Sequence, residues 1–134
     1  MARIVDVEGI GPVYAEKLQA AGIKTTDVLL EKGASPQGRK AIEEQTGISH
    51  GLILEWVNHV DLYRIKGVAS EYSDLLEEAG VDTVVELGHR VAANLYQKMM
   101  EVNAEKELVR RLPTEKQVAD WIEQAKKLPR GVNY

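Results

Sequence analysis

The stretch VEGIGPVY at residues 7–14 decides the fold, because it returns 58 residues later as IKGVASEY at residues 65–72. The correspondence continues at positions that set backbone shape and helix packing, whereas the residues between those positions differ. A fixed offset of this kind indicates two copies of one structural unit. The further matched pairs are Leu18 with Leu76, Gly22 with Gly80, Thr25 with Thr83, and Leu29 with Leu87.

Each copy predicts a glycine turn followed by two helices. The first helix begins near Pro12 or Ser70, since proline suits a position whose N–H has no partner in the helix. Apolar residues then recur at helical spacing until Gly22 or Gly80, which is placed to end the helix in a left-handed conformation. A short second helix follows Thr25 in the first copy and Thr83, whose spacing to Glu86 is that of a capping box, in the second copy.

The rest of the chain predicts further helices and no strands. Capping residues and apolar spacing place them at about residues 35–45, 49–64, 91–102 and 114–127, the last opened by a capping box. We therefore expect an all-α, compact helical domain of about eight helices. Residues 1–60 would form a first unit and residues 61–134 a second unit with a C-terminal helix, both sharing one merged core.

Composition excludes several classes of function. The chain has 134 residues, 44% hydrophobic content, no cysteine and a net charge of −4. Without cysteine there are no disulfides, thiol nucleophiles or thiolate metal sites, which favours a cytoplasmic protein. Acidic charge disfavours a protein that coats nucleic acid. No apolar run is long enough to span a membrane and the first residues do not resemble a signal peptide, so we expect no membrane association.

Catalytic motifs are also missing from the sequence. His50, His59 and His89 lack metal-binding spacing, and we expect them at the surface or at helix ends. No phosphate loop, nucleophile elbow or dinucleotide fingerprint is present. We therefore predict no catalytic residue, no metal and no cofactor, and a protein that is not an enzyme. Two further expectations are that Arg39 pairs with glutamates on its own helix, and that the two tryptophans, on apolar stripes, lie in the core.

The sequence resembles known proteins in two ways, through a short motif and through longer stretches of the chain. The sequence GIGP at residues 9–12 with Tyr14, Ala15 and Leu18 after it, and the GV at residues 67–68 with Glu71 and Tyr72, resemble helix-hairpin-helix motifs of the SAM-domain-like class. Longer stretches are similar to a family of uncharacterised bacterial proteins, catalogued as domain of unknown function 4332. They are WVN at 56–58, RIKGV at 64–68, VRRLP at 109–113 and WIEQA at 121–125. This second resemblance covers nearly the whole chain and implies no established activity.

The helix-hairpin-helix resemblance implies a mechanism. In similar motifs, backbone N–H groups of the glycine turn and the N-terminus of the next helix bind one phosphate of a nucleic acid, and a nearby cation assists. Carried onto this sequence, the contact would be made by Gly9, Ile10 and Gly11, with Lys17 and Arg3 as helpers. The second copy has Ala69 in place of the second glycine and a carboxylate just beyond it, so we expect it to be structural.

Two functions from different classes remain open at this point. The first is a non-catalytic protein that binds the DNA or RNA backbone weakly and without sequence preference, through the first glycine turn. The second is a protein-interaction or scaffold module in which both turns serve only the fold. A nuclease is disfavoured because the catalytic part of nucleases with similar motifs is missing. The sequence leaves the oligomeric state open.

Overall fold

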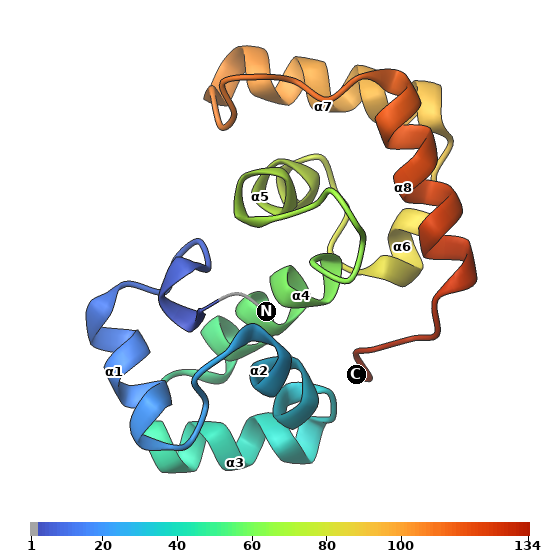
Figure 1. Ribbon diagram of the computed structural model, residues 1–134. Coiled ribbons are helices and arrows are strands. Elements are labelled where there is room, and N and C mark those ends of the chain that lie inside the picture. Colours follow the sequence, from blue (N-terminus) through green and yellow to red (C-terminus); the bar gives the residue numbers. More distant parts are fainter. Residues whose placement is uncertain (1–2) are drawn as a thin grey trace. The chain divides into compact units, whose positions relative to one another are not determined.

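The computed structural model describes residues 3–134, which contain eight α-helices and one 3₁₀ helix (Figure 1). Within that range the only β-type pairing is an isolated bridge between Arg3 and Thr25. The predicted all-α class with about eight helices is confirmed. The elements in chain order are η1 (Ile4–Asp6), α1 (Pro12–Ala20), α2 (Thr26–Gly33), α3 (Pro36–Thr46), α4 (His50–Leu62), α5 (Ser70–Glu78), α6 (Val84–Gly88), α7 (Ala92–Lys106) and α8 (Glu115–Lys127).

The helices group into two compact units. The first unit runs to Asp61 and also contains Gly131–Tyr134, and the second unit is Leu62–Arg130. The division therefore falls at the end of α4, and the chain returns to the first unit after α8. The sequence predicts residues 131–134 as part of the second unit, whereas the structure groups them with the first.

Side-chain caps set where several helices begin. Thr25, Ser35 and Thr83 each accept a hydrogen bond from the backbone N–H three residues further on, as an N-cap does. Thr114 and Gln117 form the complete, reciprocal capping box that the sequence predicts. The Glu86 side chain accepts from the N–H of Asp82 instead of the Thr83 N–H, so the box expected at α6 is only half formed.

The first unit is built around apolar side chains from η1, α1, α2, α3 and α4. Helix α3 contacts both α1 and α2 (Figure 1). Burying these side chains removes their apolar area from water, which contributes about 25 cal/mol per Å². The buried set includes Ile4, Val7, Ile10, Leu18, Ile23, Leu29, Ile42, Ile53, Trp56, Val57 and Val132.

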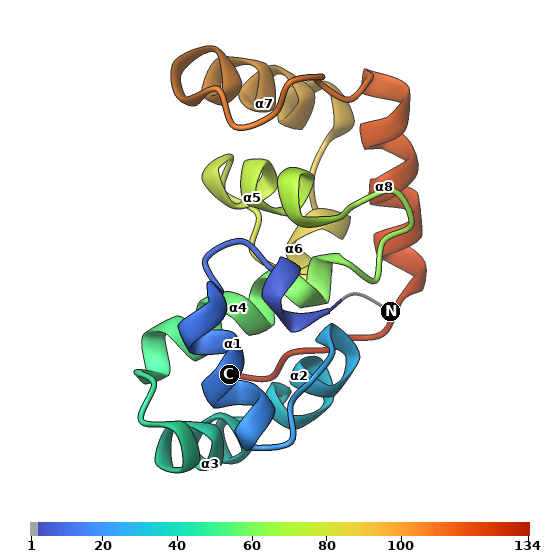
Figure 2. The same ribbon diagram turned by 60° about the vertical axis from the view of Figure 1, so that its left-hand side comes forward.

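The second unit has its own apolar cluster. Helix α7 contacts both α5 and α8, and α6 packs on α8 (Figure 2). The cluster includes Leu62, Ile65, Leu75, Leu76, Val81, Leu87, Leu95, Met99, Val118, Trp121 and Ile122. Helix α8 supplies residues at helical spacing, which explains why its buried stripe is readable from sequence.

Candidate functional site

The first glycine turn, residues 7–11, is a hydrogen-bonded β-turn that leads directly into α1. The N–H of Ile10 donates to the carbonyl of Val7 at 3.0 Å, and Gly9 in the third position of the turn has φ +89°. A type II turn requires a positive φ at this position, which glycine adopts without strain. Ile10 is buried, whereas Gly9 and Gly11 are exposed. The side chain between the two glycines anchors the turn, and the glycines face solvent.

The second glycine turn, residues 65–69, has the same local structure. The N–H of Val68 donates to the carbonyl of Ile65 at 3.1 Å, and Gly67 has φ +102°. Hydrogen bonds also correspond at the helix that follows: Ala15 donates to Gly11 and Ser73 donates to Ala69, both at 2.9 Å. Each residue of these pairs is 58 positions from its counterpart, the offset of the sequence match.

A tryptophan from the last helix of each unit lies against the turn. A Cβ built on Gly9 would lie 3.3 Å from Nε1 of Trp56, and a Cβ built on Gly67 would lie 3.0 Å from Nε1 of Trp121. Both tryptophans are buried, as predicted. Glycine is thus required at both positions by the backbone angle and by the close approach of an indole.

A tyrosine completes each arrangement. The ring centroids of Tyr14 and Trp56 are 5.1 Å apart, and those of Tyr72 and Trp121 are 5.3 Å apart. Tilted aromatic pairs at this spacing are favourable beyond the area they bury. The tyrosines were matched by the sequence repeat. The tryptophans were missed as partners of the turns because their separation in sequence is not 58, and the available signal was one tryptophan on the final helix of each unit.

The N-terminus of α1 is open at Gly11. This residue is the N-cap, makes no side-chain capping bond, and has extended backbone angles of φ −83° and ψ −177°. A Cβ built on it meets nothing within 4 Å. Ala69 holds the equivalent place before α5 in a similarly extended conformation. The fold therefore does not require glycine at position 11, and the place where a side chain would begin is open.

The two predicted helper cations lie in different places. Arg3 is near the turn and forms an ion pair with Asp6 at 3.2 Å, with the two side chains 78% and 53% exposed. A pair this exposed is worth about 0–1 kcal/mol, so it holds Arg3 only loosely. Lys17 is exposed on α1, where it lines a surface depression with Ala20, Ala21 and Gln45. It stands more than one helical turn from Gly11.

Acidic side chains also surround the first turn. Asp6 and Glu8 are exposed, and Glu8 lies within the turn itself. The corresponding residue of the second turn is Lys66. Any anion at the first turn would be bound by backbone groups against this local negative charge, which limits its affinity.

The second turn is braced from α8. The Gln124 side chain accepts a hydrogen bond from the N–H of Lys66 at 2.8 Å and donates one to the carbonyl of Lys66 at 3.1 Å. One amide side chain thus satisfies both backbone groups of a turn residue. No counterpart of this brace at Glu8 occurs among the hydrogen bonds of residues 3–134, so the backbone of the first turn is less constrained.

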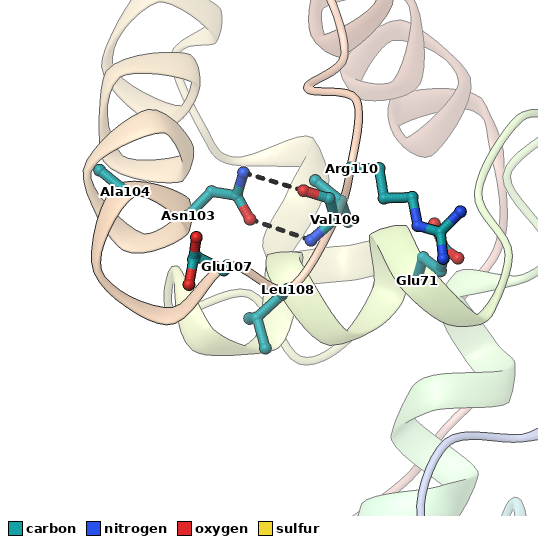
Figure 3. Close-up of a pocket in the computed structure, with 7 residues that line it drawn as sticks. All are labelled: Glu71, Asn103, Ala104, Glu107, Leu108, Val109 and Arg110. Atoms are coloured by element: carbon teal, nitrogen blue, oxygen red, sulfur yellow. Dashed lines mark hydrogen bonds between the residues drawn. The ribbon is translucent and has the colours of Figure 1, made fainter.

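A surface depression of ≈ 620 Å³ lies in the second unit between the start of α5 and the end of α7 (Figure 3). Asn103 fixes its wall, because its side-chain amide donates to the Val109 carbonyl at 3.2 Å and accepts from the Val109 N–H at 2.9 Å. The side chains of Glu71, from α5, and Arg110, from the connection after α7, point toward one another (Figure 3). Asn103 therefore ties the connection after α7 to that helix.

Two expectations about polar residues are wrong. Arg39 does not pair with glutamates on α3: it is 2% exposed and donates to the carbonyls of Gly33 at 2.8 Å and Asn133 at 2.7 Å. Burial lowers the pKa of its guanidinium. His59 is buried at 3% exposure and not at the surface. Both residues lie on amphipathic helices, and the spacing of charges alone does not show which of them turns inward.

The fold and its turns define an all-helical protein in which two similar glycine turns are each packed against a tryptophan. The family model for the domain of unknown function DUF4332 matches residues 8–128, and the chain belongs to this family. No curated protein and no solved structure matches the chain. Within residues 3–134, none of the helices combines the length and apolar character needed to cross a bilayer.

Proposed function

We propose that this chain is a non-catalytic helix-hairpin-helix protein that binds the phosphate backbone of DNA or RNA weakly and without sequence preference. The contact is made by the first glycine turn and the N-terminus of α1. The observation that carries the proposal is the open space in front of Gly11, where an extended, uncapped backbone begins a nine-residue helix. A phosphate that approaches the N–H groups of this first turn is not opposed by a side chain at position 11.

Unsatisfied N–H groups supply the attraction. The first helical hydrogen bond of α1 is the one from Ala15 to Gly11, so the N–H groups of Val13 and Tyr14 precede it. Together with the helix dipole, such groups favour an anion at the N-terminus. The lack of a side-chain cap at Gly11 leaves this position available to a ligand.

Rigidity of the turn supports the same proposal. Trp56 and the buried Ile10 hold the turn from beneath, so binding a phosphate costs little ordering of the backbone. Arg3 adds a loosely held cation on the same segment, whereas Lys17 lies further along α1 and contributes its charge only at a distance. Asp6 and Glu8 oppose binding, and this is why the proposed affinity is weak.

A salt series with matched variants tests the proposal. Binding to a generic DNA duplex is measured for the wild type, Gly11→Glu and Ala69→Glu, each at several salt concentrations. We expect a wild-type Kd of about 10⁻⁴–10⁻⁶ M at low salt, and a slope of log K against log salt of about −1 to −2, as for one or two phosphates. Gly11→Glu removes binding because its carboxylate occupies the anion position. Ala69→Glu is the matched control and retains it.

We expect Gly11→Glu to fold like the wild type. Gly11 has extended angles and open space, so the new side chain is accommodated and a loss of binding reports on the contact itself. Equal binding by wild type and Gly11→Glu contradicts the proposal, and so does a wild type that fails to bind at about 50 mM salt, where screening is weak.

One observation favours the alternative, a protein-interaction module. Val13, in the first turn of α1, is 67% exposed and lies beside the first glycine turn. An exposed apolar residue next to acidic ones suits a protein surface better than a phosphate. A photo-crosslinking amino acid at position 13 separates the two functions in cells: nucleic-acid adducts support the backbone-binding proposal, and protein adducts without nucleic acid support the alternative.

A further inference from the structure

The segment Gly131–Tyr134, called the strap below, packs as an extended peptide on the first unit. It belongs to that unit although the residues before it belong to the second. The strap has neither helix nor strand, and its Val132 side chain is 1% exposed. The strap is therefore held by specific contacts and not by regular secondary structure.

Main-chain hydrogen bonds fix the centre of the strap. The N–H of Asn133 donates to the carbonyl of Ala34 at 2.8 Å, and the carbonyl of Asn133 accepts from Nη2 of Arg39 at 2.7 Å. Both polar backbone groups of one residue are thus satisfied by the connection between α2 and α3 and by α3 itself. Recognition through the main chain, with a buried side chain next to it, is the usual way in which proteins bind an extended peptide.

The end of the strap makes two further contacts. The hydroxyl of Tyr134 donates to Oδ1 of Asn58 at 2.9 Å, and Cζ of Arg39 lies 6.0 Å from the centroid of the Tyr134 ring. A cation at this distance from an aromatic face is attracted to it. Ala34, Arg39 and Asn58 together are called the strap slot.

Arg39 shows that the slot is built for its occupant. Burying a guanidinium is costly unless its N–H groups are hydrogen-bonded, and one of its two acceptors is the strap. Its Nε, also buried, has no hydrogen-bond partner among the described residues. Counted from the N-caps Ser35 and Val91, the residue of α7 that corresponds to Arg39 is Leu95, a buried apolar side chain. The repeated fold alone does not require the slot.

Leu128 packs on the core of the second unit and the Pro129 carbonyl accepts a hydrogen bond from Arg64, so the strap can open for exchange about the bonds that follow Pro129. Residues 128–130 connect α8 to the strap without regular secondary structure and contain Pro129, which cannot continue a helix. Every named contact of the strap is made by residues 132–134. An identical segment from another molecule can therefore form the same contacts, and exchange of identical elements is a low-cost route to dimers.

We propose that the strap slot of the first unit is a peptide-binding site whose partner is the strap of a second copy of this chain. In a single molecule the slot is filled by its own strap, which the linker holds at an effective concentration in the millimolar range. Exchange between copies links two molecules without creating any new contact. This site is separate from the first glycine turn, and its existence does not depend on nucleic-acid binding.

Complementation between two full-length variants tests the proposal. Arg39→Gln has a defective slot and an intact strap, and Val132→Asp has an intact slot and a defective strap. We expect each variant alone to sediment as a monomer, and an equimolar mixture to form a one-to-one dimer at a few hundred micromolar. The matched control is a mixture of Arg39→Gln with the double variant Arg39→Gln/Val132→Asp, which offers no intact slot and stays monomeric.

Two results overturn the proposal. The first is a mixture that remains monomeric at about 1 mM although both variants keep the wild-type circular dichroism, because a strap that is closed within one molecule at a millimolar effective concentration must also bind an intact slot at a comparable free concentration. If either variant does not fold, amide hydrogen exchange of the wild type decides. If the strap can leave its slot, the hydrogen of the Asn133 amide exchanges with solvent through local opening. We expect its rate to be at least ~100-fold faster than that of the core Leu29 amide. Exchange of Asn133 only at the rate of the core is the second contradicting result.

Discussion

The indole Nε1 of Trp56 lies beneath Gly9, 3.3 Å from the place where a Cβ would stand, and Trp121 has the same relation to Gly67 at 3.0 Å. Each tryptophan comes from the final helix of its unit and also packs on a tyrosine of the helix that follows the turn. These contacts connect the turn, the first helix and the last helix of each unit. They make the turn a fixed element on which a binding surface can be built.

Gly9→Ala destabilises the first unit, whereas Gly11→Ala leaves it unchanged. At Gly9 the new Cβ meets Trp56, and the residue must keep a φ of +89°. Non-glycine residues in such conformations cost about 1–3 kcal/mol. At Gly11 the angles are ordinary and the space is open, so we expect a change within about 0.5 kcal/mol. Urea denaturation of both variants measures the difference, and equal stability of the two contradicts the structure of the turn.

Gln124→Ala loosens the second glycine turn. The substitution leaves the N–H and the carbonyl of Lys66 without their protein partner. Because these groups become accessible to water, we expect a loss of about 1 kcal/mol. Gln97→Ala is the matched control, since Gln97 is an exposed residue on α7 that bonds only with Glu101 in the described structure. Thermal or urea unfolding in which both substitutions cost the same would show that the brace contributes nothing.

Glu8→Lys strengthens binding to a nucleic-acid duplex. It replaces an exposed carboxylate of the first turn with the residue that the second turn carries, Lys66. One more phosphate neutralised changes the slope of log K against log salt by about −0.9. The reciprocal change, Lys66→Glu, is expected to leave both affinity and slope as they are. A stronger effect at Lys66 than at Glu8, measured by fluorescence anisotropy over a salt series, would move the contact to the second turn.

The parts of the fold that could be predicted are those set by interactions between residues close together in the sequence. The helix starts at Thr25, Ser35 and Thr114 were predicted because each cap is a short-range interaction between neighbouring residues. The two turns were predicted because a turn position with positive φ selects glycine, which is visible in the sequence at Gly9 and Gly67. The helix over residues 91–102 extends further, to Lys106, where Glu107 takes the left-handed conformation without a glycine to signal the end.

The contacts that define the site and the strap were not predictable, because they join residues far apart in the chain. Nothing near Gly9 in the sequence indicates Trp56, and nothing near Arg39 indicates Asn133. The spacing of Arg39 to the glutamates of α3 predicts an intrahelical ion pair. In the structure Arg39 is buried instead, because the elements that pack against a short, polar helix determine which of its faces points inward.

The most direct test of the proposed phosphate contact is a titration of the ¹⁵N-labelled protein with a generic DNA duplex, observed through its backbone amides. We expect the largest chemical-shift changes at Gly9, Gly11 and Val13, with smaller ones near Arg3 and with all of them reversed by salt. The amides of Gly67 and Ala69 serve as the internal reference, because they occupy the same geometry in the second turn. Shift changes centred on those two residues, or no changes at the first turn at low salt, would contradict the proposal.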